Sequence, residues 1–179
     1  MLSRRYEARR ESPASQLMID LEAIVNRLAK GKVRFVIVGG VAATVYGSSF
    51  ITDDLDICYA RDKLNLEVLA ETLAPFNPRL RGAPSGLPFI WDAETLLKGL
   101  NFTLRTDLGD LDLLGEISGI GTYEQMRDTA INVVLFGVEC SIISLENLIA
   151  AKRAAGRAKD RLVLPELEAL LEATKDQTE

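Results

Sequence analysis

The sequence of 179 residues contains no histidine. This absence excludes catalytic triads built on histidine, zinc sites with histidine ligands, and histidine as a general acid or base. Any catalysis by this chain therefore has to use carboxylates, lysines, hydroxyl groups or bound metal ions.

Cysteine is also scarce. The two cysteines, Cys58 and Cys140, each lie within an apolar pattern typical of a β-strand. Buried thiols of this kind pack as small apolar side chains. We therefore expect two core thiols, rather than a disulfide or a pair of metal ligands.

Long apolar runs are missing as well. No run approaches the about 20 residues that a membrane-spanning helix needs. The arginine-rich start of the chain is not followed by the apolar stretch of a signal peptide. We therefore expect a cytoplasmic protein without membrane association.

The charge balance is acidic, with 21 basic and 26 acidic residues and a net charge of −5. This balance argues against a nucleic-acid binder held by an overall positive field, although a local basic patch stays possible.

The hydrophobic content of 47% is ordinary for a globular protein. We expect one domain over residues 13–174, with a helix that begins at Pro13 and ends at Gly31, after a flexible tail over residues 1–12.

The most informative stretch runs from residue 33 to residue 59. A short apolar run, 35–38, predicts a β-strand that Gly39 and Gly40 bring to an end. Residues 41–46 predict a short helix. A second strand is expected from Asp54 to Tyr59, where acidic and apolar residues alternate.

The alternation places Asp54 and Asp56 on the same face of the second strand. Adjacent carboxylates repel one another unless a cation lies between them. An isolated Asp-x-Asp pair is more often part of a turn. Here, however, the pair follows Gly39 and Gly40 at a helix start, a position suited to an anion. Phosphate beside a divalent metal is the common arrangement of phosphoryl-transfer sites.

A hydrophobic strand, Gly39-Gly40, thirteen residues and then Asp54-Leu55-Asp56 resembles the signature of the DNA polymerase β-like nucleotidyltransferase superfamily. Within it, the sequence resembles the small AbiEii toxin-like proteins. The resemblance covers residues 33–171. It implies an α/β (α+β) fold, in which a mixed sheet is flanked by helices, and a third carboxylate on a neighbouring downstream strand.

Residues 108–114 supply that third carboxylate. Asp112 lies between two leucines, which matches the apolar–acidic–apolar pattern that the superfamily requires. Asp110 shares its face but lies nearer the turn at Gly109, so it is the second choice.

The last region predicts a helix that begins after Ser144 and continues to Arg161, unless Gly156 interrupts it. Lys152 and Lys159 fall on its apolar face. They can extend past the edge of the core into solvent, or they can reach a phosphate. This run also resembles a lysine- and arginine-bearing motif of AbiEii-like proteins. A further helix is expected to begin at Pro165.

The resemblance implies transfer of a nucleoside monophosphate from a nucleoside triphosphate (NTP) to a hydroxyl acceptor. It implies two Mg²⁺ ions held by three carboxylates, and phosphates bound by glycine, threonine and lysine residues: Asp54, Asp56 and Asp112 for the metal, and Gly39, Gly40, Thr52, Lys152 and Lys159 for the nucleotide. RNA, a protein or a small molecule can each be the acceptor. A toxin-like role would add an antitoxin partner.

One position departs from the pattern. Related proteins commonly carry an arginine two residues before Thr52, where this chain has Phe50. Arg79 and Arg81, in a segment rich in proline and glycine that predicts a loop (75–88), can replace it or can simply be solvated. The alternative to an enzyme is therefore an inactive nucleotide-binding or regulatory module on the same fold.

Other phosphate-binding motifs fit less well. The sequence lacks GxxxxGK[ST] and GxGxxG, which argues against the common mononucleotide- and dinucleotide-binding loops. A phosphatase of the dehalogenase type would place the acidic pair directly after an apolar strand, but polar residues precede Asp54. An EF-hand would need further ligands that the sequence does not provide.

Overall fold

The computed structural model describes residues 19–84 and 86–176. The helices are α1 (Leu21–Lys30), α2 (Gly39–Val45), α3 (Lys63–Leu73), the short 3₁₀ helix η1 (Ala74–Phe76), α4 (Ala93–Lys98), α5 (Tyr123–Met126), α6 (Leu145–Ala155) and α7 (Ala158–Asp176). The strands are β1 (Phe35–Val38), β2 (Asp54–Tyr59), β3 (Arg79–Leu80), β4 (Asn101–Thr106), β5 (Gly109–Leu114), β6 (Glu116–Ile117), β7 (Gly121–Thr122), β8 (Ile131–Leu135) and β9 (Val138–Ile142).

Seven strands form one mixed sheet in the order β3-β4-β5-β2-β1-β9-β8. The pairs β2–β5 and β1–β9 are parallel, and the other neighbours are antiparallel. Strands β6 and β7 form a separate antiparallel pair. The predicted mixed sheet with flanking helices is therefore confirmed.

The two faces of the central strands differ in chemistry. On β2 and β5 the apolar residues alternate with the acidic ones, and Leu55, Ile57, Leu111 and Leu113 are fully buried. Each such side chain stabilises the fold by roughly 1.5–3 kcal/mol. The acidic residues point to the opposite face, so core formation fixes the direction in which the carboxylates project.

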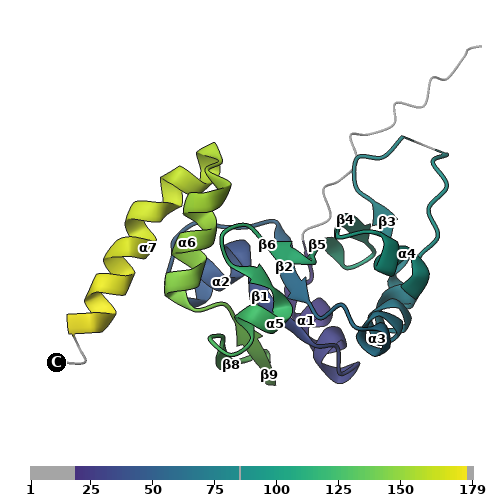
Figure 1. Ribbon diagram of the computed structural model, residues 1–179, viewed down its shortest axis with the longest axis horizontal. Helices are drawn as coiled ribbons and strands as arrows, with labels where there is room; N and C mark the ends of the chain where they lie inside the picture. Colours follow the sequence, from purple (N-terminus) through teal and green to yellow (C-terminus); the bar gives the residue numbers. More distant parts are fainter. Residues whose placement is uncertain (1–18, 85, 177–179) are drawn as a thin grey trace, which may run out of the picture.

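Helices flank the sheet at both of its ends (Figure 1). Helices α3 and α4 pack together near β3 and β4, while α6 and α7 lie side by side at the other end. None of the helices in the described ranges is long and apolar enough to cross a membrane.

Two local predictions are confirmed. Strands β8 and β9 form a hairpin, and its turn residues Phe136 and Gly137 both have positive φ angles, 52° and 78°, as a two-residue hairpin turn requires. Cys58 and Cys140 are buried free thiols.

The prediction for the first helix is wrong at its start. Helix α1 begins at Leu21, and Asp20 caps it by accepting a hydrogen bond from the amide of Ala23 at 2.9 Å. Because Ile19 and Asp20 are not helical, no continuous helix leads from Pro13 to Gly31. The expected tail over residues 1–12, together with Pro13, lies outside the described residues.

Two later segments also differ from prediction. The expected loop over residues 75–88 begins within η1 and contains the edge strand β3, which pairs with β4. The expected helix from Ser144 to Arg161 ends at Ala155, because Gly156 adopts a left-handed conformation with φ of 61°. Pro165 lies inside α7 rather than at its start, and the buried Val163 and Leu167 hold the helix to the core on both sides of the proline.

Candidate active site

Four carboxylates meet on one face of the sheet, where β2 and β5 run parallel. The register pairs Asp54 with Asp110 and Asp56 with Asp112. Carboxylate oxygens of Asp54, Asp56 and Asp112 all lie within 4.8 Å of one another. The structure therefore brings together the three carboxylates that the sequence analysis selected.

The glycine turn lies directly against this cluster. Gly39 has φ of 65°, and a Cβ atom there would lie 2.0 Å from Oδ2 of Asp56. A Cβ atom on Gly40 would lie 2.5 Å from Cβ of Thr52. Both positions need glycine because no side chain fits between the turn and the acidic strand. The turn forms the first residues of α2, two positions earlier than the helix start expected at Val41.

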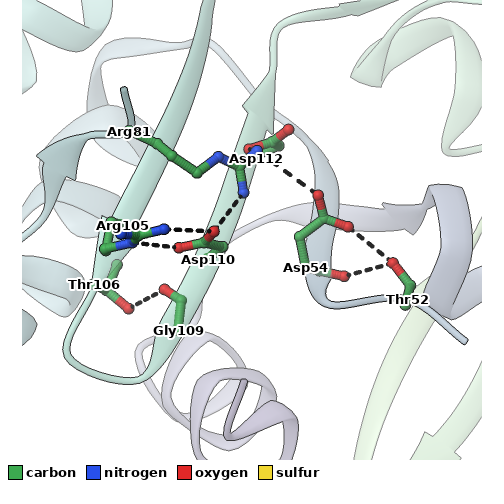
Figure 2. Close-up of polar contacts among 8 residues, drawn as sticks. All are labelled: Thr52, Asp54, Arg81, Arg105, Thr106, Gly109, Asp110 and Asp112. Atoms are coloured by element: carbon green, nitrogen blue, oxygen red, sulfur yellow. Dashed lines mark hydrogen bonds and ion pairs between the residues drawn. The ribbon is translucent and has the colours of Figure 1, made fainter. Parts of the chain in front are cut away.

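Thr52 fixes one of the carboxylates. Its hydroxyl donates a hydrogen bond to Oδ1 of Asp54 at 2.8 Å (Figure 2). This contact holds one oxygen of Asp54 and leaves Oδ2 facing the rest of the cluster.

A guanidinium group lies on the other side of Asp54. Figure 2 shows Arg81 reaching across the sheet to the acidic residues. Its Nη2 atom lies 2.8 Å from Oδ1 of Asp112 and 3.7 Å from Oδ2 of Asp54, and its Nη1 atom lies 3.0 Å from Oδ2 of Asp110. Arg81 thus contacts the cluster directly and is not a solvated loop residue.

Two arginines form ion pairs with Asp110. Besides Arg81, Arg105 contacts it, with Nε 3.0 Å from Oδ1 of Asp110. Burial opposes ionisation of Asp110, but the hydrogen bonds from Arg105 and Arg81 outweigh it and lower its pKa. Asp110 is therefore a paired anion beside the site.

Asp56 and Asp112 are in a different electrostatic state. Burial, followed by the negative charges of Asp54 and Asp112, raises the pKa of Asp56 to about 6. Burial also raises the pKa of Asp112, in part against the opposing effect of Arg81. Carboxylates held this close need an added cation to share the ionised state at neutral pH.

A second group of charges comes from the helices. Asp160, at the start of α7, is fully buried. Its Oδ2 accepts a hydrogen bond from Nε of Arg157 at 2.7 Å, and its Oδ1 lies 3.3 Å from Nζ of Lys152. Burial opposes ionisation of Asp160, but Arg157 and Lys152 lower its pKa, so Asp160 anchors both cations as an anion.

Two clefts open on either side of the carboxylates. The first, here called the glycine cleft, has a volume of about 310 Å³. Its lining includes the glycine turn, both residues of the acidic pair and three basic side chains: Gly39, Gly40, Phe50, Thr52, Asp54, Asp56, Lys152, Arg157 and Lys159.

The second, here called the β6 cleft, has a volume of about 360 Å³. Asp112, the polar residues Asn101, Glu116 and Ser118, and an apolar wall that includes Ile117 line it. The two clefts share Gly39, Asp56, Lys152 and Arg157. The carboxylates are therefore reachable from two directions.

The structure brings all eight predicted site residues to this region, and Phe50, 45% exposed, lines the glycine cleft. Two further contributors, Arg157 and Asp160, were not selected from the sequence. Gly156, which interrupts the helical pattern just before them, could have indicated that they turn toward the site. Arg81 was considered only as a contact to phosphate, and its contact with the carboxylates was not expected.

The donor set fits a magnesium ion. Mg²⁺ prefers hard oxygen ligands and usually binds through one or two carboxylates together with substrate phosphates. Asp54, Asp56 and Asp112 offer only carboxylate oxygens, and the basic residues of the glycine cleft lie beside them.

Comparison with known proteins supports the fold. No protein-family model and no curated protein matches the sequence. Among solved structures, the lincosamide antibiotic adenylyltransferase LnuA, bound to lincomycin, is similar with a TM-score of 0.53 and 15% identity, over 83% of this chain and 94% of LnuA. A Thermotoga maritima protein assigned as a nucleotidyltransferase is similar with a TM-score of 0.52 and 17% identity, over 86% of this chain and 97% of that protein. The chain thus shares the fold of nucleotidyltransferases.

Proposed function

We propose that this protein is a metal-dependent nucleotidyltransferase that moves a nucleoside monophosphate from an NTP to a hydroxyl group. One observation carries the proposal: three carboxylates lie within 4.8 Å of one another, and two of them, Asp54 and Asp56, line a cleft together with a glycine turn and three basic side chains. The shared fold adds support, because LnuA is an adenylyltransferase.

The charges of the two clefts suggest how the substrates are divided. The triphosphate enters the glycine cleft, where Lys152, Arg157 and Lys159 offset its negative charge. The acceptor enters the β6 cleft, which borders Asp112. A Mg²⁺ ion held by the carboxylates would neutralise the phosphate oxygens and activate the α-phosphorus for attack.

Asp112 is the proposed general base. The acceptor oxygen forms a bond to the α-phosphorus while the bond to the pyrophosphate oxygen breaks, and the hydroxyl proton passes to Asp112. The raised pKa of Asp112 makes it a better proton acceptor than an ordinary exposed aspartate. Thr52 holds Asp54 in place through its hydrogen bond.

Arg157 is the proposed replacement for the arginine that related proteins carry at the position of Phe50. Both residues line the glycine cleft. Arg81 is less suited to this role, because its guanidinium group lies among the carboxylates of the acidic cluster, whereas Arg157 lines the glycine cleft.

The acceptor that we favour is a small molecule. The β6 cleft has a volume of about 360 Å³ and a partly apolar wall, dimensions that suit a drug-sized ligand. RNA and protein hydroxyl groups stay alternatives. The toxin-like role, the antitoxin partner and the cytoplasmic location that the sequence suggested also stay predictions.

An inactive nucleotide-binding module is the second candidate, favoured by Phe50 at a position where related enzymes carry arginine. Both candidates predict nucleotide binding, and only the first predicts turnover.

Binding is tested by the thermal shift of the protein with ATP, CTP, GTP or UTP, each with and without Mg²⁺. We expect at least one nucleotide to raise the melting temperature in a Mg²⁺-dependent manner, because a ligand that binds only the folded state stabilises it. The Asp56→Asn variant should lose this shift. Absence of a shift with all four nucleotides would contradict both candidates.

A further inference from the structure

We propose that the site binds one divalent metal ion, and that Arg81 supplies the positive charge that a second ion would otherwise supply. The inference rests on the proposed function, since it concerns the metal content of the same site. It replaces the expectation of two Mg²⁺ ions.

The sheet fixes Arg81 in place. Just beyond β3, the amide of Arg81 donates a hydrogen bond to the carbonyl oxygen of Thr103 at 2.9 Å. Thr103 is the register partner of Asp112, and Asp112 is the register partner of Asp56. Neighbouring strands lie about 4.8 Å apart, so the long arginine side chain has to cross β4 to reach Asp112, and the short Thr103 leaves room for it.

The guanidinium group lies beside two carboxylate oxygens that a second ion would need. Its Nη2 atom is 2.8 Å from Oδ1 of Asp112 and 3.7 Å from Oδ2 of Asp54. A magnesium ion bound to the same two oxygens would therefore lie beside the Arg81 cation. Because like charges repel, Arg81 disfavours an ion at these two oxygens.

The local charge agrees with a single divalent ion. Asp110 is paired by Arg105 at 3.0 Å and so is already neutralised. Arg81 offsets one of the three remaining charges, those of Asp54, Asp56 and Asp112. Two negative charges are left, which one divalent ion balances.

Arg79 provides a matched control. It lies on the edge strand β3, two residues before Arg81, but its side chain is 66% exposed and lies 3.7 Å from Asp107, outside the cluster. The Arg81 side chain is 24% exposed and contacts three carboxylates. Removing either arginine changes the net charge equally. A difference in metal binding between the two variants therefore reports the position of the arginine and not its charge alone.

The test is titration of the full chain with Mn²⁺ in the absence of nucleotide. Calorimetry and the electron paramagnetic resonance signal of free Mn²⁺ measure how many ions bind and how tightly. We expect one Mn²⁺ per chain for the wild type and for Arg79→Ala. We expect Arg81→Ala to bind a second Mn²⁺, or to bind the first at least about tenfold more tightly. Arg81→Lys, which keeps the charge, should stay close to the wild type.

Arg81→Gln, a neutral residue of similar length, gives the same readout if the alanine variant does not fold. Two Mn²⁺ ions per wild-type chain would overturn this inference and leave the proposed function intact. Unchanged or weaker Mn²⁺ binding by the neutral Arg81 variants would also overturn it. A wild-type chain that binds neither Mn²⁺ nor any NTP would overturn the proposed function as well.

Discussion

The site has two basic sides, and they are built differently. Arg81 and Arg105 project from the sheet and contact the carboxylates directly. Lys152 and Arg157 project from α6 and the turn after it, and the buried Asp160 holds them. The strand-borne arginines therefore neutralise the acidic cluster, whereas the helix-borne cations open into the clefts and stay available to a ligand.

This difference shows how a site with four carboxylates can still bind an anionic substrate. Cations that touch the carboxylates reduce the repulsion that four carboxylates on one face create. Cations that a separate buried anion holds do not form ion pairs with the carboxylate cluster. Asp160 is therefore as important to the proposed function as the cations that it holds.

The largest expected effect on activity comes from substitution of Asp56, which lies between the strand arginines and the helix cations. Asp56→Asn removes a metal ligand, so we expect nucleotidyl transfer to fall at least about a hundredfold. Steady-state turnover measures this loss. Melting temperature is the control, because the variant should fold at least as stably as the metal-free wild type. Retention of more than a tenth of the activity would contradict the assignment.

The helix side is tested by Asp160→Asn. Without the anion, Lys152 and Arg157 lose their common partner, and we expect NTP binding to weaken about tenfold, equivalent to about 1.4 kcal/mol. The Michaelis constant for NTP should rise more than the turnover number falls.

Glu168→Gln is the control for Asp160→Asn. It removes an exposed ion pair with Arg153 (2.6 Å) between the same two helices, outside the clefts. Such pairs contribute about 0–1 kcal/mol, so NTP binding should not change. Equal effects of the two variants would show that helix packing, and not cation placement, matters.

The pH dependence of stability gives the next test. The pKa of Asp56 is raised to about 6 in the folded protein, so the folded state binds this proton more tightly than the unfolded state does. The resulting stabilisation is fully present below about pH 4 and is lost as the pH rises through 6.

In metal-free buffer, lowering the pH from 7 to 5 should therefore stabilise the wild type relative to Asp56→Asn by about 1.4 kcal/mol. Urea unfolding of both proteins at each pH measures this difference. If the difference in the free energy of unfolding between the two proteins were the same at pH 5 and pH 7, the pKa of Asp56 would not be raised in the folded protein.

The smallest expected effect is a gain. Phe50→Arg restores the arginine of related proteins in the glycine cleft, and we expect NTP affinity to rise a few-fold through one added phosphate contact. Because Phe50 is 45% exposed, the free energy of unfolding should change little. Calorimetric titration with NTP measures the gain. Unchanged or weaker binding would contradict the expectation that the glycine cleft accepts a further phosphate contact beside Arg157.

The carboxylate triad could be predicted from sequence because its signal is local. On a strand, the alternation of acidic and apolar residues decides which face the acidic side chains share, so the placement of Asp54 and Asp56 followed from the pattern, whereas Asp112 followed from the third carboxylate that the resemblance implied. The closeness of Gly39 to Asp56 followed less directly, since it depends on how the turn folds back on β2.

The arginine side could not be predicted in the same way. Strand β3 has two residues, too few to show a period, and it lies within a segment where prolines and glycines predict a loop. Only the pairing of β3 with β4 shows that Arg81 faces Asp112. Asp160 escaped notice because the continuous helix expected from Ser144 placed it to one side, whereas the break at Gly156 turns it inward.

Incubation of the protein with candidate acceptors and NTP labelled at either the α- or the γ-phosphate tests the central claim most directly. The account predicts that the α-label moves to the acceptor in a Mg²⁺-dependent reaction, while the γ-label leaves as pyrophosphate. Asp56→Asn should transfer neither label. Transfer of the γ-label to the acceptor would contradict the account, because it would identify a kinase reaction.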